Sequence, residues 1–182
     1  MDFWQIILVI AVGFIAGIIN VMAGGGSLLT MPLLIFLGLD STMANGTNRI
    51  AILFQNATAI GGYQSKGQSP GRFSIYLGIS ALFGAIIGSK IALEIPDGVF
   101  NKILAVVMVL VVIMTLLNPS LKLKDGEKLI VRLDKKHKLM AVGALFLIGI
   151  YGGFIQAGTG LFIMAALSFI NRYSLLQSNV AK

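Results

Sequence analysis

The chain has 182 residues, of which 57% are hydrophobic and only 12% are charged. Soluble domains contain about 25% charged residues, so this composition excludes an ordinary soluble domain and indicates an integral membrane protein. The net charge of +7 does not indicate nucleic acid binding, because the basic residues are concentrated in loops between apolar segments. Cysteine is absent, which excludes disulfide bonds and thiolate chemistry but does not identify a compartment.

The first apolar segment, residues 3–22, has no basic residues before it, so we expect a retained transmembrane helix rather than a cleaved signal peptide. Gly24, Gly25 and Gly26 then interrupt the hydrophobic sequence, and residues 28–39 are apolar again. As a helix this second piece rises about 18 Å, too short for a hydrocarbon core of about 30 Å. The glycines therefore indicate either a close helix crossing or a broken helix whose free amides form a binding site at membrane depth.

Three full-length spans are predicted next, in residues 45–63, 73–93 and 99–117. The second of these contains Gly84 and Gly88, a GxxxG spacing that favours close helix packing over ligand binding. The third is almost free of polar groups, which is typical of a structural or lipid-facing helix.

The only long hydrophilic segment is residues 118–138, with seven Lys or Arg against three Asp or Glu. The positive-inside rule predicts that this loop is cytoplasmic. Lys66 and Arg72 lie two crossings earlier and fall on the same side, whereas Glu94 and Asp97 fall on the other. Counting back along the spans predicts an extracytoplasmic N-terminus.

An internal repeat connects the two ends of the chain. Residues 157–160 (Ala-Gly-Thr-Gly) match residues 23–26 (Ala-Gly-Gly-Gly) at an offset of 157 − 23 = 134, and the same offset places Asn45 on Asn179. Three complete spans separate the copies, so the second copy enters the membrane from the opposite side. The predicted fold is an all-α polytopic membrane protein with inverted-topology repeats and re-entrant, glycine-broken helices.

The repeat divides the chain into residues 1–117 as a first transmembrane repeat, 118–138 as a basic cytoplasmic loop and 139–182 as the start of the second inverted repeat. The second repeat is then incomplete, and we expect a complete transporter to have about 250 residues. The alternative is a short protein that completes its site as a homodimer. The topology also requires Arg172, which follows the second short segment, to be cytoplasmic.

Five stretches carry a resemblance to the sulfite exporter TauE/SafE family of bacterial membrane permeases. They are residues 13–20, 23–34, 44–49, 149–153 and 157–160. The chain departs from the pattern at Thr159, which stands where the first copy has Gly25, and in lacking the final helices. The resemblance implies a multi-pass protein of the bacterial inner membrane that moves small sulfur-containing anions such as sulfite or sulfoacetate.

The residues near the two breaks suit a small anion. A helix that begins after a glycine break directs free N–H groups and the positive end of its dipole at one point, which favours an oxyanion. Hydroxyls, amides and cations nearby add donors. The candidate substrate-binding residues are Asn20, Gly24, Gly25, Gly26, Ser27, Asn45, Thr47, Asn48, Arg49, Gln156, Gly158, Thr159, Gly160, Asn179 and Lys182.

Several of these residues have simpler explanations. Asn45 has the residue type of a helix N-cap, and Arg49 could extend to the membrane interface. Gln55 and Asn56 lie in an apolar run, where amides more often join helices than contact substrate. No carboxylate lies well inside a span, so the sequence identifies no proton carrier and coupling to protons stays open.

An enzyme is not predicted. The single histidine, His137, lies in the basic loop, and no acidic pair lies within a span, so no metal, cofactor or catalytic constellation is expected. The glycine run also lacks the Gly-Lys-Ser/Thr of a phosphate-binding loop. The predicted function is a secondary transporter that moves a small anion by alternating access at a midplane site between the broken helices. An anion channel and a non-transporting membrane subunit or adaptor are the alternatives.

Overall fold

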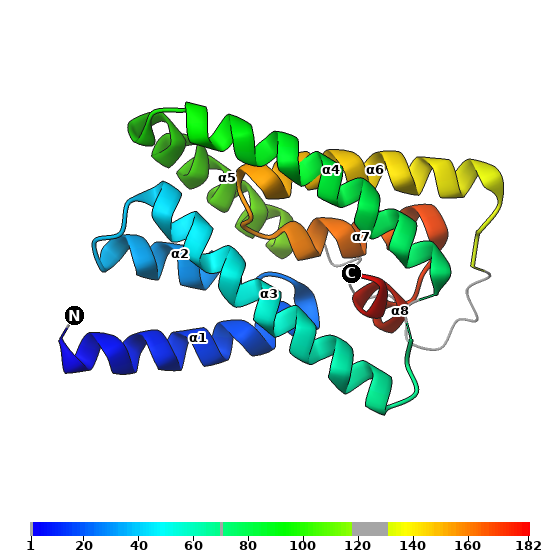
Figure 1. Cartoon of the computed structure of the whole chain (residues 1–182), viewed down its shortest axis with the longest axis horizontal. Helices are drawn as coiled ribbons and strands as arrows, with labels where there is room; N and C mark the ends of the chain where they lie inside the picture. The colour runs from blue at the N-terminus through cyan, green and yellow to red at the C-terminus, as the bar shows by residue number, and fades with distance from the viewer. Residues whose placement is uncertain (1, 70, 118–130) are drawn as a thin grey trace.

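A computed structural model describes residues 2–69, 71–117 and 131–182, and these residues form helices and no strands. The helices are α1 (Phe3–Ala23), α2 (Ser27–Phe36), α3 (Ser41–Ser65), α4 (Arg72–Glu94), α5 (Asp97–Leu117), α6 (Lys135–Phe154), α7 (Thr159–Asn171) and α8 (Leu175–Ala181) (Figure 1). The predicted all-α membrane class is confirmed. Most of the predicted basic loop, residues 118–130, lies outside the described residues.

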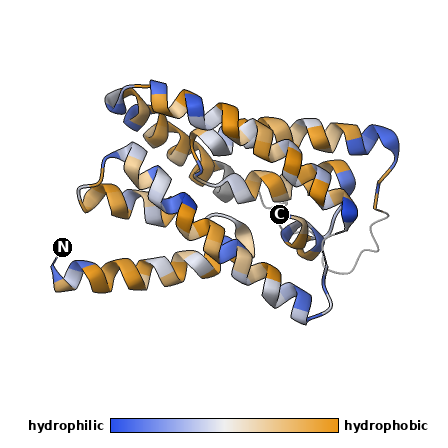
Figure 2. Cartoon of the chain, viewed as in Figure 1, coloured by the Kyte–Doolittle hydropathy of each residue, from blue (hydrophilic) through white to orange (hydrophobic). Residues whose placement is uncertain are grey.

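Three of the described helices, α1, α4 and α6, are both long and apolar enough to cross a bilayer, and α7 with α8, bent by 120°, would make a fourth. Hydrophobic residues cover the length of these helices, while hydrophilic residues concentrate near their ends (Figure 2). Large side chains such as Phe14 and Phe83 are 71% and 61% exposed. Exposed apolar side chains along such helices are expected where the surrounding solvent is lipid.

The α3 helix differs from the prediction. It begins at Ser41, with Asp40 as its N-cap, four residues before the predicted start at Asn45. Two of its polar residues, Asn45 and Asn48, face the interior of the protein at 3% and 2% exposure. These inward-facing amides, together with exposed polar residues such as Thr47, make this 25-residue helix less apolar than its neighbours.

The α1–α2 and α6–α7 hairpins open toward opposite ends of the molecule (Figure 1). The turn between α2 and α3 lies beside the start of α5, where Thr42 Oγ1 donates to Asp97 at 2.7 Å. The end of α7 lies beside the approach to α6, where Asn171 Nδ2 donates to the Arg132 carbonyl oxygen at 3.0 Å.

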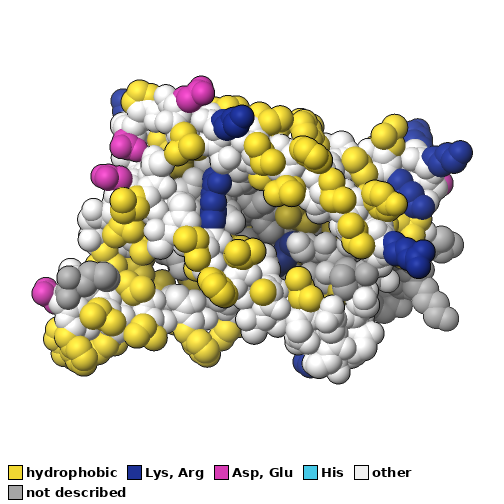
Figure 3. All heavy atoms as spheres, viewed as in Figure 1, with side chains coloured by type: hydrophobic (Ala, Val, Ile, Leu, Met, Phe, Trp, Pro, Cys, Tyr) yellow, Lys and Arg dark blue, Asp and Glu magenta, His cyan; other side chains and the backbone are white. Residues whose placement is uncertain are grey.

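The two ends also differ in charge. Most of the acidic side chains visible in Figure 3 lie at the left end, and the largest group of Lys and Arg lies at the right end. Arg172, the C-cap of α7, lies beside the approach to α6. Which end is cytoplasmic, and whether the hairpins form an inverted repeat, stay predictions.

The α4 and α6 helices run parallel and touch through glycines contributed by both. A Cβ atom on Gly84 or Gly88 of α4 would overlap a backbone carbonyl oxygen of α6. A Cβ atom on Gly149 or Gly153 of α6 would likewise overlap a carbonyl oxygen of α4. The packing role predicted for the GxxxG spacing is confirmed, and it is reciprocal.

Gly149→Val should destabilise the protein, because the added side chain collides with the α4 backbone and forces α4 and α6 apart. Overpacking of this kind typically costs about 1–3 kcal/mol. The measurement is the melting temperature of purified protein in detergent. Gly143→Val is the matched control, since a Cβ atom at Gly143 of the same helix meets nothing within 4 Å. An equal loss in both variants would contradict the packing role.

Candidate functional site

Both hairpins turn at glycines with left-handed backbone conformations. Gly24 ends α1 with φ = 83°, and its N–H donates to the Asn20 carbonyl oxygen at 2.9 Å. Gly158 begins α7 with φ = 71°. L-residues with side chains are strained at such φ values, so glycine is the residue that permits both turns.

The two turns meet inside the protein, backbone against backbone. A Cβ atom on Gly160 would lie 2.5 Å from the Gly24 Cα atom, and one on Gly24 would overlap the Gly160 backbone. Ser27 joins the same turns, since its Oγ accepts from the Gly158 N–H at 3.1 Å and donates to the Gln156 carbonyl oxygen at 3.3 Å. We call this contact between the two glycine turns the junction.

The three consecutive glycines have different roles at the junction. A Cβ atom on Gly26 would overlap the Ala16 carbonyl oxygen and lie 2.7 Å from the Asn20 Cβ atom. A Cβ atom on Gly25 would make only an ordinary contact, 3.6 Å from the Leu161 Cδ1 atom. Close approach therefore requires Gly24 and Gly26 but not Gly25.

An asparagine from each half of the chain caps the broken helix of the other half. Asn45 Nδ2 donates to the carbonyl oxygen of Phe154, the last residue of α6, at 2.9 Å. Asn179 Nδ2 donates to the carbonyl oxygen of Met22, in the last turn of α1, at 3.1 Å. Asn45 is thus not an N-cap, because it lies within α3 and reaches across to α6. Asn45 and Asn179, which the predicted repeat aligns, thus make similar contacts.

A cation accompanies each asparagine. The Arg49 guanidinium donates to the Gly153 carbonyl oxygen, and Lys182 Nζ donates to the Asn20 carbonyl oxygen at 2.9 Å. Cations are favourable at helix C-termini, where carbonyl groups lack partners and the helix dipole is negative. Arg49 therefore points into the protein rather than to the membrane interface.

Several buried donors near the junction have no acceptor among the described residues. Asn48 accepts from Thr30 Oγ1 at 2.5 Å, but its own Nδ2 is unpaired, as is Arg49 Nε. The first backbone bonds of α2 are donated by Leu28 and Leu29, which leaves the N–H groups before Leu28 at the helix N-terminus. Buried unpaired polar groups are costly, so such a concentration indicates a place for water or ligand.

The remaining candidates divide between the junction and other locations. Thr159 Oγ1 donates to the Gln156 carbonyl oxygen at 3.0 Å, and Gln156 Oε1 is buried without a partner among the described residues. Asn20 Nδ2 donates to Gln55 Oε1 at 2.9 Å, which joins α1 to α3. Thr47 is exposed on α3 and does not face the junction.

A pocket of about 230 Å³ adjoins the junction between α1, α3, α4 and α8. Its polar lining includes Asn179 and Lys182 from the predicted set, and Asn56, Tyr63 and Ser74, which sequence reasoning did not place in the site. Asn56 could have been recognised from the sequence, because it is an amide in an apolar run. Tyr63 and Ser74 could not, because they resemble ordinary residues near the ends of spans. Pockets for drug-sized ligands are about 300–1,000 Å³, so this one suits a smaller molecule.

Comparison with curated proteins identifies relatives that are named as transporters. The chain is 26% identical over 165 residues to the probable membrane transporter protein ORF9 of Sinorhizobium sp., covering 91% of this chain and 61% of that protein. It is 29% identical over 157 residues to a probable membrane transporter protein of Haemophilus influenzae, covering 84% and 58%. It is 28% identical over 172 residues to the probable membrane transporter protein YfcA of Escherichia coli K12, covering 94% and 60%.

The chain therefore spans about three fifths of the length of these relatives. No solved structure matches it. The family model described as sulfite exporter TauE/SafE matches residues 9–182, nearly the whole chain. With several apolar helices and relatives named as membrane transporters, the protein is a multi-pass membrane protein. The chain belongs to the sulfite exporter TauE/SafE family.

Proposed function

We propose that this chain forms the substrate-binding part of a secondary transporter for a small anion. The observation that carries the proposal is the junction, where two helix breaks from distant parts of the chain meet beside buried, unpaired donors. The relatives named as probable membrane transporters support transport as the activity, and the family description supports a sulfur oxyanion or organosulfonate, such as sulfite or sulfoacetate, as the substrate.

The positive charges around the junction favour an anion, and the buried unpaired atoms there include acceptors (Asn45 Oδ1, Gln156 Oε1) as well as donors. The N-terminus of α2 supplies free amides and the positive end of a helix dipole. Asn48 Nδ2 and Arg49 Nε are buried donors that lack a protein acceptor in the described part of the chain. Lys182 adds a second cation at the edge of the neighbouring pocket. None of the residues lining that pocket is acidic.

The reciprocal contacts across the junction support alternating access as the mechanism. Each half of the chain caps the broken helix of the other half with one asparagine and one cation. If one set of contacts loosens while the other holds, the junction opens toward one end of the molecule at a time. Both sets of contacts are formed in this structure, so one proposed opening lies at Asn179 and Lys182 and the other at Asn45 and Arg49.

The same proposal assigns the orientation in the membrane. The end that carries most of the described basic residues faces the cytoplasm of a bacterial inner membrane, together with the loop at residues 118–138. The N-terminus, at the end with the acidic α4–α5 turn, is then extracytoplasmic.

Arg49→Gln should weaken anion binding by the purified chain, because it removes the positive charge and the unpaired Nε donor at the junction. With sulfite or sulfoacetate at a hundredfold excess over its Kd, we expect the unchanged protein to melt about 5–10 °C higher than without ligand. The variant should lose most of this shift, and Arg49→Lys should retain part of it. The measurement is the melting temperature with each anion.

Lys66→Gln is the matched control, because it removes one positive charge from an exposed turn outside the site. Taurine and lactate test selectivity, since taurine carries a compensating cation and lactate is a carboxylate. If no sulfur anion shifts the melting temperature, or if Lys66→Gln loses the shift as fully as Arg49→Gln, the proposed site is wrong.

Gly24→Ala should abolish transport while Gly25→Ala preserves it, although the two glycines are adjacent. A Cβ atom at Gly24 overlaps the Gly160 backbone at a positive φ, whereas one at Gly25 has room. The measurement is counterflow of radiolabelled sulfite into proteoliposomes preloaded with unlabelled sulfite. Alternating access predicts a transient accumulation above equilibrium. Simple equilibration of the label would instead indicate an anion channel. Equal transport by the two variants would show that the close approach at Gly24 is not needed for transport.

A further inference from the structure

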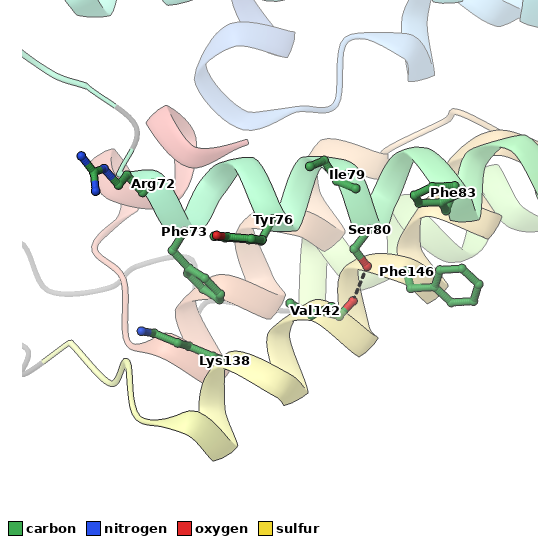
Figure 4. A pocket seen from close by; sticks show the side chains of 9 residues that line it. All are labelled: Arg72, Phe73, Tyr76, Ile79, Ser80, Phe83, Lys138, Val142 and Phe146. Carbon is green, nitrogen blue, oxygen red and sulfur yellow. Dashed lines mark hydrogen bonds between the residues drawn. The ribbon is translucent and has the colours of Figure 1, made fainter.

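A second pocket, of about 720 Å³, lies on the outer face of α4 and α6, away from the junction. Figure 4 shows its lining side chains along the two helices: Arg72, Phe73, Tyr76, Ile79, Ser80, Phe83, Lys138, Val142 and Phe146. The two helices that form the pocket are joined by their glycine contacts and by the Ser80 hydroxyl, which donates to the Val142 carbonyl oxygen at 2.7 Å. We call this pocket the α4–α6 groove.

The two ends of the groove differ in chemistry. Arg72 and Lys138 lie at one end, and the Tyr76 hydroxyl points toward that end (Figure 4). Lys138 Nζ lies 5.9 Å from the centre of the Phe73 ring, a cation–π contact that positions the ammonium at the end of the groove. None of the described residues that line the groove is acidic, so neither cation is neutralised within it.

The rest of the groove is apolar and open toward the side of the helix pair. Tyr76 and Phe83 are 65% and 61% exposed, and Phe83 and Phe146 lie at the end farthest from the cations. From Arg72 to Phe83 the helix rises roughly 16 Å, which is about half of a 30 Å hydrocarbon core. The groove is therefore about as long as one leaflet of a bilayer, with its basic end at the membrane surface.

We propose that the α4–α6 groove binds an anionic phospholipid, such as phosphatidylglycerol. The phosphate lies at Arg72 and Lys138, and one acyl chain follows the aromatic side chains toward Phe83 and Phe146. The charge of the groove end selects an anionic headgroup, because basic residues at a membrane surface attract anionic lipid. The proposal is independent of the transported substrate, since the groove shares no lining residue with the junction or with the pocket at Lys182.

The test uses fluorescence quenching by brominated lipids in mixed micelles. The chain has a single tryptophan, Trp4, so Trp4→Phe combined with Phe146→Trp places one fluorophore at the apolar end of the groove. Phosphatidylglycerol with brominated chains should quench this tryptophan at a much lower lipid fraction than phosphatidylcholine with the same chains. Adding Arg72→Gln and Lys138→Gln should weaken the apparent affinity for phosphatidylglycerol about thirtyfold, since each basic residue near an anionic lipid contributes roughly fivefold.

Lys90→Gln in the same tryptophan background is the matched control, because Lys90 is an exposed cation of α4 that does not line the groove. It should leave quenching by phosphatidylglycerol unchanged. Equal quenching by the two lipids would show that the groove accepts any acyl chain and would overturn the proposal. If neither lipid quenches the tryptophan, protein covers the groove and the proposal is wrong. The proposal is also wrong if Lys90→Gln weakens quenching by phosphatidylglycerol as much as the double variant does.

Discussion

The backbone contact between Gly24 and Gly160 is the constraint on which the rest of the arrangement depends. Two helix breaks can touch only if neither carries a side chain, and the positive φ at Gly24 reinforces that requirement. Once they touch, the N-termini of α2 and α7 lie on one side of each break and the C-termini of α1 and α6 on the other. The capping contacts, the free amides and the adjoining pocket are all located around this backbone contact between Gly24 and Gly160.

The two kinds of helix end at the junction differ in whether protein groups occupy them. The carbonyl ends of α1 and α6 are occupied by protein groups, since Lys182 and Arg49 donate to them together with Asn179 and Asn45. The amide end of α2 has no such partner among the described residues. Fixed cations thus lie at the negative ends of the α1 and α6 dipoles, whereas no described protein group occupies the positive end of α2.

Glycines serve a different purpose between α4 and α6. There the GxxxG spacings, exemplified by Gly84 and Gly149, bring α4 and α6 into direct backbone contact. Helices in lipid gain little from the hydrophobic effect, so this close van der Waals contact is what holds the pair. This pair forms the base of the α4–α6 groove on its outer side.

The sequence by itself determined the features that depend on local pattern: the apolar helices α1, α4 and α6, the glycines at the two turns and the packing glycines. It could not decide what each polar side chain contacts. Asn45 proved to be a cap for α6 rather than for its own helix, Arg49 turned inward, and Thr47 turned outward. Tyr63 entered the pocket without any sequence signal. These outcomes depend on contacts between residues more than 100 positions apart, and helical periodicity carries no information about which distant backbone will lie opposite a given face.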